Sequence, residues 1–467
     1  MSLCWISVSP KSPYFITEDG RPWTPIGQND AIDWPDLAGL FRRRDIEAVR
    51  SYFGMLVSSG VSVLRLMLEY CHREHRYFEK PAGVFPADML NLWDDLFGLC
   101  EEFGLRILLT PFDTFWMWRR WRHHPYSASR GGPCANRRQL YVCPATRVYV
   151  KRRFEFVSRR WGGSGVIFAW DLWNELHPAY GMNSAEAARE FVTDISTHLR
   201  NFEMRLHGRT HLQTVSVFLP LLQQMPELSE VIYRHPQLDF ASTHFYENGT
   251  IDHPRDTIAP AVSTGTLVRA ALDQTGPERP FFDSEHGPIH TFRNGRRTLP
   301  ETFDDEYFRH IQWAHFASGG AGGAMRWPNR HPHTLTAGMR RAQKVLADFL
   351  PCIDWTCFRR ENWNQHVRAR GSAPVVVFAS GDEHQAVIWV LRKTPLQKNG
   401  MLDRTAAAID VELELPWRSG PPVTIYACDT LQGSSDPGLV QVRHSEGPLI
   451  VAVKALTADR AFALQRG

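Results

Sequence analysis

Residues 167–178 read IFAWDLWNELHP, an apolar and aromatic run that ends in an asparagine and a glutamate. Glycines precede this run, and its length and composition predict a strand buried on both faces, over Val166–Trp173. A carboxylate at the end of such a strand loses much of its hydration, and packing gains nothing from it. Glu175 is therefore a candidate for chemistry rather than for stability.

The same unit recurs through the first 350 residues, where short apolar runs alternate with longer amphipathic stretches. This alternation is typical of βα units. The predicted strands are Trp23–Gly27, Val61–Met67, Leu105–Pro111, Val166–Trp173, Leu212–Val217, Phe240–Phe245, Pro280–Ser284 and Gly322–Trp327. The predicted helices are Asp45–Ser59, Ala87–Phe103, Ala145–Trp161, Ser184–Leu206, Leu221–Arg234, Val262–Gln274, Asp304–Ala317 and Ala337–Phe349.

Eight such units predict an α/β fold, a (β/α)8 TIM barrel over residues 1–350. No GxGxxG or GxxxxGK motif follows an early strand, which argues against a dinucleotide site or a P-loop. After Pro351 the pattern changes to short alternating strands separated by turn residues, as at Val375–Phe378 and Ala386–Leu391. Residues 351–467 are therefore expected to form a small β-sandwich, an accessory domain with no evident catalytic grouping.

Chemistry in a TIM barrel gathers at the carboxyl ends of the strands, which gives a rule for finding the site. The fourth predicted strand ends at Asn174 and Glu175, and the seventh is followed by Glu285. Cleavage of a glycosidic bond needs two carboxyl groups, one to protonate the leaving oxygen and one to attack the anomeric carbon or activate water. The two glutamates are expected to converge to about 5 Å across one barrel mouth.

The stretch Arg160–Glu175 resembles the acid/base strand of clan A glycoside hydrolases, and within that clan it is most similar to family 5, which contains cellulases and mannanases. The resemblance covers roughly residues 20–350. It implies a (β/α)8 barrel that hydrolyses β-glycosides with retention, with Glu175 as acid/base and Glu285 as nucleophile. It also implies supporting roles for four residues, namely Arg65, His244, Tyr246 and Trp327. One position departs from the family, which often has a histidine after the third strand where this chain offers Asp113.

This resemblance leads to a hypothesis about protonation. Apolar surroundings should raise the pKa of Glu175 and keep it protonated, whereas Arg65 and the Tyr246 hydroxyl should favour ionised Glu285. Asn174 is expected to bind the sugar 2-hydroxyl. His244 could steady either Glu175 or a sugar hydroxyl, and a buried histidine bonded to backbone is the alternative.

Tryptophan is unusually frequent, with 16 residues in the chain. Trp327, Trp173 and the cluster that begins at Trp116 are candidates for stacking on sugar rings, although any single tryptophan is more often core. Two pairs of histidines, His123 with His124 and His331 with His333, lack the spacing of a metal motif and are interpreted as loop residues. No cofactor and no metal are expected.

The bulk composition is that of an ordinary globular protein. The 53 basic and 50 acidic residues are spread along the chain. The net charge therefore indicates no particular partner, and a nucleic-acid partner is not expected. No segment approaches ~18 unbroken apolar residues, and no membrane partner is expected. Scattered cysteines and an N-terminus without a leader pattern favour a cytoplasmic protein, unless a leader has been removed.

The expected substrate is a β-linked oligosaccharide. Family resemblance favours β-mannosides over β-glucosides, and a long insertion at Trp116–Arg138 that could close one end of the cleft favours exo-action. A β-glucosidase or endo-β-glucanase of the same family, a carbohydrate-binding barrel without activity, and a metal-dependent hydrolase are the alternatives. The sequence indicates no oligomeric state.

Overall fold

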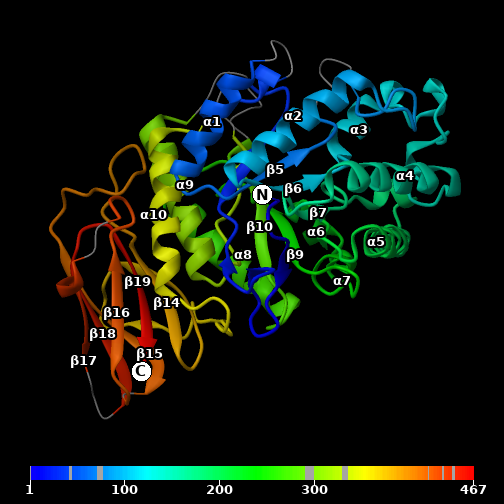
Figure 1. Cartoon of the computed structure of the whole chain (residues 1–467). Helices are drawn as coiled ribbons and strands as arrows, with labels where there is room; N and C mark the ends of the chain where they lie inside the picture. The colour runs from blue at the N-terminus through cyan, green and yellow to red at the C-terminus, as the bar shows by residue number, and fades with distance from the viewer. Residues whose placement is uncertain are drawn as a thin grey trace.

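A parallel barrel and a two-sheet sandwich beside it make up the molecule (Figure 1). The computed structural model describes residues 2–40, 45–70, 77–289, 299–328, 335–418, 420–433, 436–443 and 447–467. No helix in these ranges is both long and apolar enough to cross a membrane. The predicted fold class, a (β/α)8 barrel followed by a β-sandwich, is confirmed.

Seven parallel strands form most of the barrel. They are β4 (Gly27–Asp30), β5 (Val63–Met67), β6 (Arg106–Thr110), β7 (Ile167–Asp171), β8 (Leu212–Thr214), β9 (Ala241–Phe245) and β10 (Phe281–His286). A bridge between Phe218 and His244 joins the end of β8 to the end of β9. The order along the chain is therefore the order around the barrel, as expected for successive βα units.

In the predicted eighth strand, Gly322–Trp327, a single residue forms β-bridges to the neighbouring strands. Arg326 pairs in parallel with Gln28 of β4 and with His286 of β10, and this pairing closes the barrel. Gly322 has no room for a side chain, since a Cβ there would lie 2.5 Å from the carbonyl oxygen of Pro25. Trp327 follows directly at the carboxyl end.

The first barrel strand was predicted at Trp23–Gly27, and this position is wrong. Trp23 belongs to β3 (Pro22–Trp23), which pairs antiparallel with β2 (Phe15–Thr17), and β2 pairs with β1 (Ile6–Val8). This small sheet covers the amino end of the barrel, where the Phe15 ring meets the rings of Phe168, Phe240 and Phe282 edge-on. The first barrel strand is the polar segment Gly27–Asp30, which carries no apolar signal.

Helices surround the barrel. They are α1 (Ile46–Ser58), α2 (Ala87–Phe103), α3 (Thr114–Arg120), α4 (Pro144–Trp161), α5 (Ala185–His207), α6 (Leu219–Gln224), α7 (Ser229–Tyr233), α8 (Ala259–Thr275), α9 (Glu301–Ala317) and α10 (Ala337–Phe349). The helix predicted over Leu221–Arg234 is split into α6 and α7 because Pro226 lacks the amide hydrogen that a continuous helix needs. The short helix α3 was not predicted.

The remaining strands form two antiparallel sheets. One has the order β11-β13-β14-β19-β16 and the other β12-β15-β18-β17. Their bounds are β11 Glu361–Asn362, β12 Arg368–Ala369, β13 Val375–Gly381, β14 Gln385–Arg392, β15 Ile409–Arg418, β16 Val423–Cys428, β17 Val440–Arg443, β18 Pro448–Leu456 and β19 Asp459–Arg466. Phe378 and Trp389 of the first sheet share one apolar cluster with Trp313 and Phe316 of α9, so the sandwich packs directly on the barrel helices.

Candidate active site

A cleft of about 850 Å³ opens at the carboxyl ends of the barrel strands. Seven of the nine candidate residues line it, namely Asp113, Trp116, Asn174, Glu175, Tyr246, Glu285 and Trp327. The other two, Arg65 and His244, are buried and bonded to residues of that lining. The structure thus brings together side chains from β5, β9 and β10 and from the segments that follow β6, β7 and Arg326.

Glu175 and Glu285 face each other in this cleft. One oxygen from each carboxylate and a ring nitrogen of His244 all lie within 4.8 Å of one another. Nδ1 of His244 is 3.1 Å from Oε1 of Glu175 and 3.7 Å from Oε2 of Glu285. A separation near 5 Å leaves room for a sugar carbon between the carboxylates but not for an additional water molecule, as double displacement requires.

Local backbone features place both carboxylates. Glu175 has a positive φ of 49°, and its amide donates to Ser216 Oγ at 3.1 Å. In β10 the register shifts between Asp283 and Glu285, which is the signature of a bulge that redirects a side chain. Asp283 Oδ1 accepts the Glu285 amide at 3.2 Å and so stabilises this bulge. Both glutamates therefore reach the cleft through irregular rather than ideal strand geometry.

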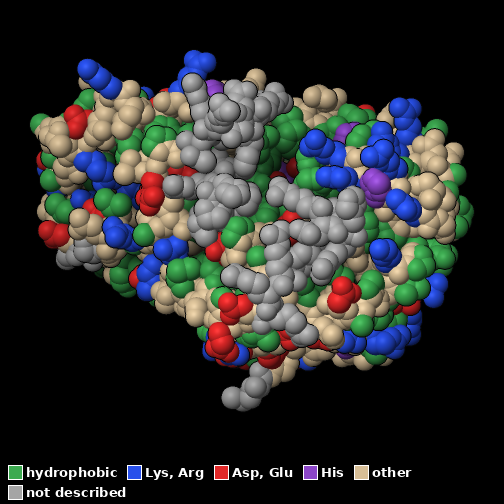
Figure 2. Space-filling view, turned by 90° about the horizontal axis from the view of Figure 1, so that it is seen from above, with side chains coloured by type: hydrophobic (Ala, Val, Ile, Leu, Met, Phe, Trp, Pro, Cys, Tyr) green, Lys and Arg blue, Asp and Glu red, His purple; other side chains and the backbone are tan. Residues whose placement is uncertain are grey.

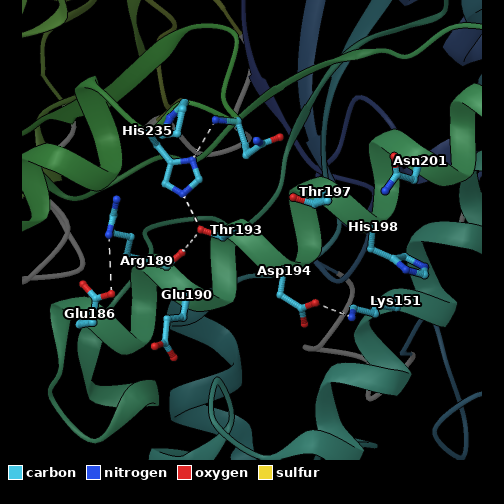
Figure 3. Close-up of a pocket in the computed structure, with 12 residues that line it drawn as sticks. Lys151, Glu186, Arg189, Glu190, Thr193, Asp194, Thr197, His198, Asn201 and His235 are labelled. Carbon is cyan, nitrogen blue, oxygen red and sulfur yellow. Dashed lines mark hydrogen bonds and ion pairs between the residues drawn. The ribbon is translucent and has the colours of Figure 1, made fainter.

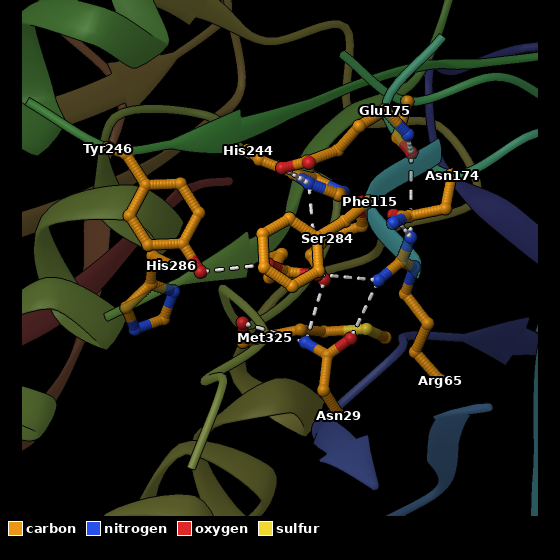
Figure 4. A network of polar contacts seen from close by, with 12 residues as sticks. Asn29, Arg65, Phe115, Asn174, Glu175, His244, Tyr246, Ser284, His286 and Met325 are labelled. Carbon is orange, nitrogen blue, oxygen red and sulfur yellow. Dashed lines mark hydrogen bonds and ion pairs between the residues drawn. The ribbon is translucent and has the colours of Figure 1, made fainter. Parts of the chain in front are cut away.

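Arg65 links the Glu285 carboxylate and the Asn174 amide to the barrel interior (Figure 4). Its Nη1 donates to Glu285 Oε2 at 2.9 Å and to Asn29 Oδ1 at 2.8 Å. Its Nη2 donates to Asp171 Oδ2 at 2.7 Å and to Asn174 Oδ1 at 2.6 Å. A buried guanidinium paired in this way fixes the planes of its partners and holds a negative charge at Glu285.

The amide of Asn174 is oriented from both sides. Its oxygen accepts from Arg65, and its Nδ2 donates to Asp113 Oδ1 at 2.5 Å. Asp113 also caps α3, since Oδ2 accepts the Trp116 amide at 2.8 Å. An amide nitrogen carries two hydrogens, so Asn174 keeps one for a ligand in the cleft. Asp113 thus positions both the Asn174 amide and the first turn of α3.

Burial controls the protonation of the pair. It raises the pKa of Glu175 to about 7, although Arg65 opposes the shift. Burial also raises the pKa of Glu285, a contribution that the sequence analysis did not include. The predicted contacts are present, with Arg65 at 2.9 Å and the Tyr246 hydroxyl at 2.8 Å, and both lower the pKa. Desolvation of a carboxylate whose side chain is only 9% exposed outweighs them.

His244 stays neutral near pH 7 because burial lowers its pKa to about 4. Its Nδ1 contacts Glu175, as expected for a residue that steadies this carboxyl group. Tyr246 donates its hydroxyl to Glu285, and its ring lies 5.4 Å from that of Phe218, which also lines the cleft.

Aromatic side chains form the walls. Trp327 packs edge-on against Trp34 and Tyr70, at ring distances of 4.9 and 5.5 Å, and Tyr70 contacts Trp116 at 5.7 Å. Trp173, a stacking candidate, is instead completely buried and donates Nε1 to Thr114 Oγ1. It stabilises the helix layer and cannot reach a sugar.

A metal ion does not fit the trio of Glu175, His244 and Glu285. The three ligand atoms are close enough, yet the Arg65 guanidinium is bonded to Glu285 beside them, and a divalent cation there would face its charge. His124 pairs with buried Glu69 at 2.9 Å, and His123 contacts Arg122 and Arg130. His331 and His333 lie outside the described residues.

Several residues of the site were missed from the sequence. Asp171 accepts from Arg65 and Ser216, and Asn29 accepts from Arg65. Asp171 is the last residue of β7. Because active-site residues of a TIM barrel gather at the carboxyl ends of strands, its position could have identified it. Asn29 could not be found this way, because the polar strand β4 was not recognised.

Several solved structures share the architecture of this chain. A family 5 glycoside hydrolase from Bacteroides vulgatus matches with a TM-score of 0.58 and 11% identity over 99% of this chain and 93% of that chain. The chain shares its fold with glycoside hydrolases. A family 30 xylanase from Clostridium acetobutylicum gives a TM-score of 0.51 and 10% identity over 99% of both chains. A family 5 mannosidase from Rhizomucor miehei gives 0.53 and 14% over 74% of this chain and 99% of that chain.

No family model matches the sequence, and no curated protein matches it.

A second hollow, of about 720 Å³, lies on the outer helix layer between α4 and α5 (Figure 3). Its charged residues pair with one another, as Lys151 does with Asp194 at 2.6 Å, and His235 bonds to Thr193 at 3.0 Å. The hollow is remote from the strand ends and presents no pair of carboxylates aimed at one point. The cleft is therefore the candidate active site.

Proposed function

We propose that the chain is a retaining glycoside hydrolase that cleaves β-linked oligosaccharides by double displacement. One observation carries the proposal: carboxylates from two strand ends lie within 4.8 Å of each other over a buried arginine. This spacing suits a covalent glycosyl intermediate, whereas an inverting enzyme needs roughly 6.5–9.5 Å for a water molecule.

In the first step an oxygen of Glu285 attacks the anomeric carbon while Glu175 gives its proton to the glycosidic oxygen. A pKa of about 7 lets Glu175 hold that proton near neutrality, and Arg65 with Tyr246 aligns the attacking carboxylate. The bond to the leaving group breaks, and a glycosyl ester forms on Glu285. Asn174 is placed to bond the 2-hydroxyl as positive charge develops on the ring.

In the second step Glu175, now ionised, takes a proton from water as the water oxygen attacks the same carbon. The ester bond breaks, Glu285 leaves as a carboxylate, and the sugar keeps its original configuration. Neutral His244, bonded to Glu175, stabilises the position of the acid/base through both steps.

β-Mannosides are the favoured substrates, and family 5 is the favoured family. Support comes from the residues that resemble that family and from a structural neighbour described as a mannosidase of family 5. Exo-action is favoured because the segment after β6 forms one wall of the cleft with Phe115, Trp116 and Trp118.

The test is a panel of aryl β-mannosides and β-glucosides with good and poor leaving groups. Glu285→Gln should lower turnover of every substrate by about 10⁴-fold, because no ester can form. Glu175→Gln should lose little with a dinitrophenyl leaving group and much with a poor one, since only the latter needs a proton. Glu186→Gln, an exposed change on α5, is the matched control.

Equal and mild losses in both variants would contradict these roles. Faster turnover of the β-glucosides would retain the mechanism and replace the sugar. An absence of turnover on the whole panel, with sugars still bound, would favour a carbohydrate-binding barrel.

A further inference from the structure

Basic residues are in excess in one segment of the chain, although the total charge is nearly balanced. From Thr114 to Phe154 there is no aspartate or glutamate, although the chain as a whole has 50. Six arginines fall in the part of this segment that joins β6 to α4, namely Arg119, Arg120, Arg122, Arg130, Arg137 and Arg138. We call these six residues the arginine rim.

The arginine rim reaches the cleft through one of its six members. Arg119 itself lines the cleft beside Trp116 and Trp118. Arg122 lies three residues further along the chain, in the 3-10 helix Trp121–His123. Figure 2 views this end of the barrel from above and shows basic side chains, with histidine among them, gathered over α3. The chain therefore concentrates positive charge on one side of the candidate active site.

The described part of the chain leaves this charge without carboxylate partners. Within the ranges that the structure describes, none of the six arginines forms an ion pair with a carboxylate. Two of them lie on aromatic rings instead, Arg119 over Phe115 at 5.1 Å and Arg137 over Trp118 at 3.4 Å. Arg137 also donates Nη1 to the Trp118 carbonyl oxygen at 2.7 Å, whereas the exposed guanidinium of Arg119 keeps its forked donors available for oxygen anions.

A smaller pocket of about 500 Å³ includes one residue of the arginine rim, Arg130. It is lined by Lys80, Arg130 and His123, with Tyr77 and two prolines. Arg130 Nη2 lies 3.0 Å from Nδ1 of His123, and Arg122 donates to the other ring nitrogen at 2.9 Å. Basic groups therefore extend from the cleft wall into a second concave site.

We propose that the arginine rim binds anionic groups of an acidic oligosaccharide, carboxylates of uronic acids or sulfate esters, while its β-linkage lies between Glu175 and Glu285. The inference rests on the proposed function and adds the substrate class. Arginine pairs with both anions in a forked geometry, and the aromatic walls bind the sugar rings between them. The pocket at Lys80 and Arg130 would take an anionic sugar beyond the one that is cleaved.

The test compares each acidic oligosaccharide with its neutral counterpart. A β-linked oligosaccharide with uronic acids is assayed beside its carboxyl-reduced form, and a sulfated one beside its desulfated form. At low salt, KM for the favoured anionic form should be about tenfold lower, and added salt should reduce the difference. The carboxylate and sulfate pairs distinguish the two sources of charge.

A triple glutamine variant, a triple lysine variant and a control variant test whether the arginine rim causes the preference for the anionic substrate. Arg119→Gln, Arg122→Gln and Arg130→Gln combined should bring the ratio of KM values close to one, and lysine at the same positions should restore part of it. Arg205→Gln, an exposed arginine at the far end of α5, should keep the preference of the wild type. Equal KM values for both pairs in the wild type, or a preference that survives the triple glutamine variant, would overturn the inference.

Neutral aryl β-glycosides separate the two claims. If they are hydrolysed and no anionic preference exists, the rim inference fails and the proposed function stands. Binding of the acidic oligosaccharide to Glu285→Gln is also measured by calorimetry. Preferential binding without any turnover by the wild type would contradict the proposed function and support the rim.

Discussion

At the scale of single residues, the site depends on a carboxyl group that is expensive to ionise. Glu175 is 19% exposed at its side chain, and burial raises its pKa to about 7. In an unfolded chain the same group ionises near its ordinary pKa. The folded protein therefore holds this proton more tightly, which favours catalysis by an acid and disfavours stability at high pH.

Glu175→Gln should remove that pH dependence. The stability that the raised pKa contributes is fully present below about pH 4.5 and is lost as pH rises through about 7. Relative to the wild type, the variant should gain roughly 1–3 kcal/mol of unfolding free energy between pH 5 and pH 8. Urea titrations of both proteins across this range measure it. A difference that stays constant with pH would show that Glu175 titrates normally in the fold.

The sequence identified the reacting residues better than the residues that support them. Glu175 and Glu285 follow apolar strands, where a carboxylate has no structural purpose. Arg65, His244 and Tyr246 were found only through resemblance. Asn29 and Ser216 carry no local signal, because their role arises from Arg65 and Glu175, which are distant in sequence. The effects of Arg65 and Tyr246 on Glu285 were predicted, but the effect of burial on its pKa was not, because burial depends on the whole cleft.

At the scale of elements, helix α3 connects the catalytic residues with the cleft wall. Asp113 caps it and also bonds Asn174, so one carboxylate fixes both the wall and the amide. Sequence periodicity missed this seven-residue helix because too few turns were present to show a pattern. Strand β4 was missed for a different reason, because its sequence, Gly27-Gln28-Asn29-Asp30, contains no apolar side chain.

Asp113→Ala should weaken both functions of this residue. Loss of the cap should cost about 1 kcal/mol of stability, and the unpaired amide of Asn174 should lower kcat/KM at least about tenfold. Asp113→Asn keeps an oxygen for the helix and should recover the stability more fully than the activity. Thermal melts and kinetics on one aryl glycoside provide the measurement. Wild-type kcat/KM in Asp113→Ala would exclude the positioning role.

At the scale of the whole molecule, the sandwich is joined to the barrel through a common core. Trp389 of β14 stacks on Phe378 at 5.0 Å and contacts His310 of α9 at 5.6 Å. Arg309 of α9 lies 3.6 Å from Asp459 of β19. The boundary near residue 350 is visible in the sequence as a change of pattern, but this shared packing is not, because long-range contacts leave no periodicity. We expect the two parts to unfold together.

Trp389→Ala tests this coupling. The side chain is completely buried, so its removal should cost about 3–5 kcal/mol. Calorimetry should show a single transition at lower temperature, and activity should be lost at that temperature. Tyr426→Ala, at a side chain 41% exposed on β16, should change little. A separate early transition with unchanged thermal loss of activity would mean that the sandwich unfolds alone.

The central claim is that Glu285 forms a covalent bond to the sugar. A dinitrophenyl 2-deoxy-2-fluoro-β-glycoside should trap the intermediate, because fluorine slows the second step more than the first when the leaving group is activated. Mass spectrometry should then find one added sugar on the peptide that contains Glu285, and none on Glu285→Gln. A label on Glu175, or an unlabelled enzyme that releases product of inverted configuration, would contradict the account.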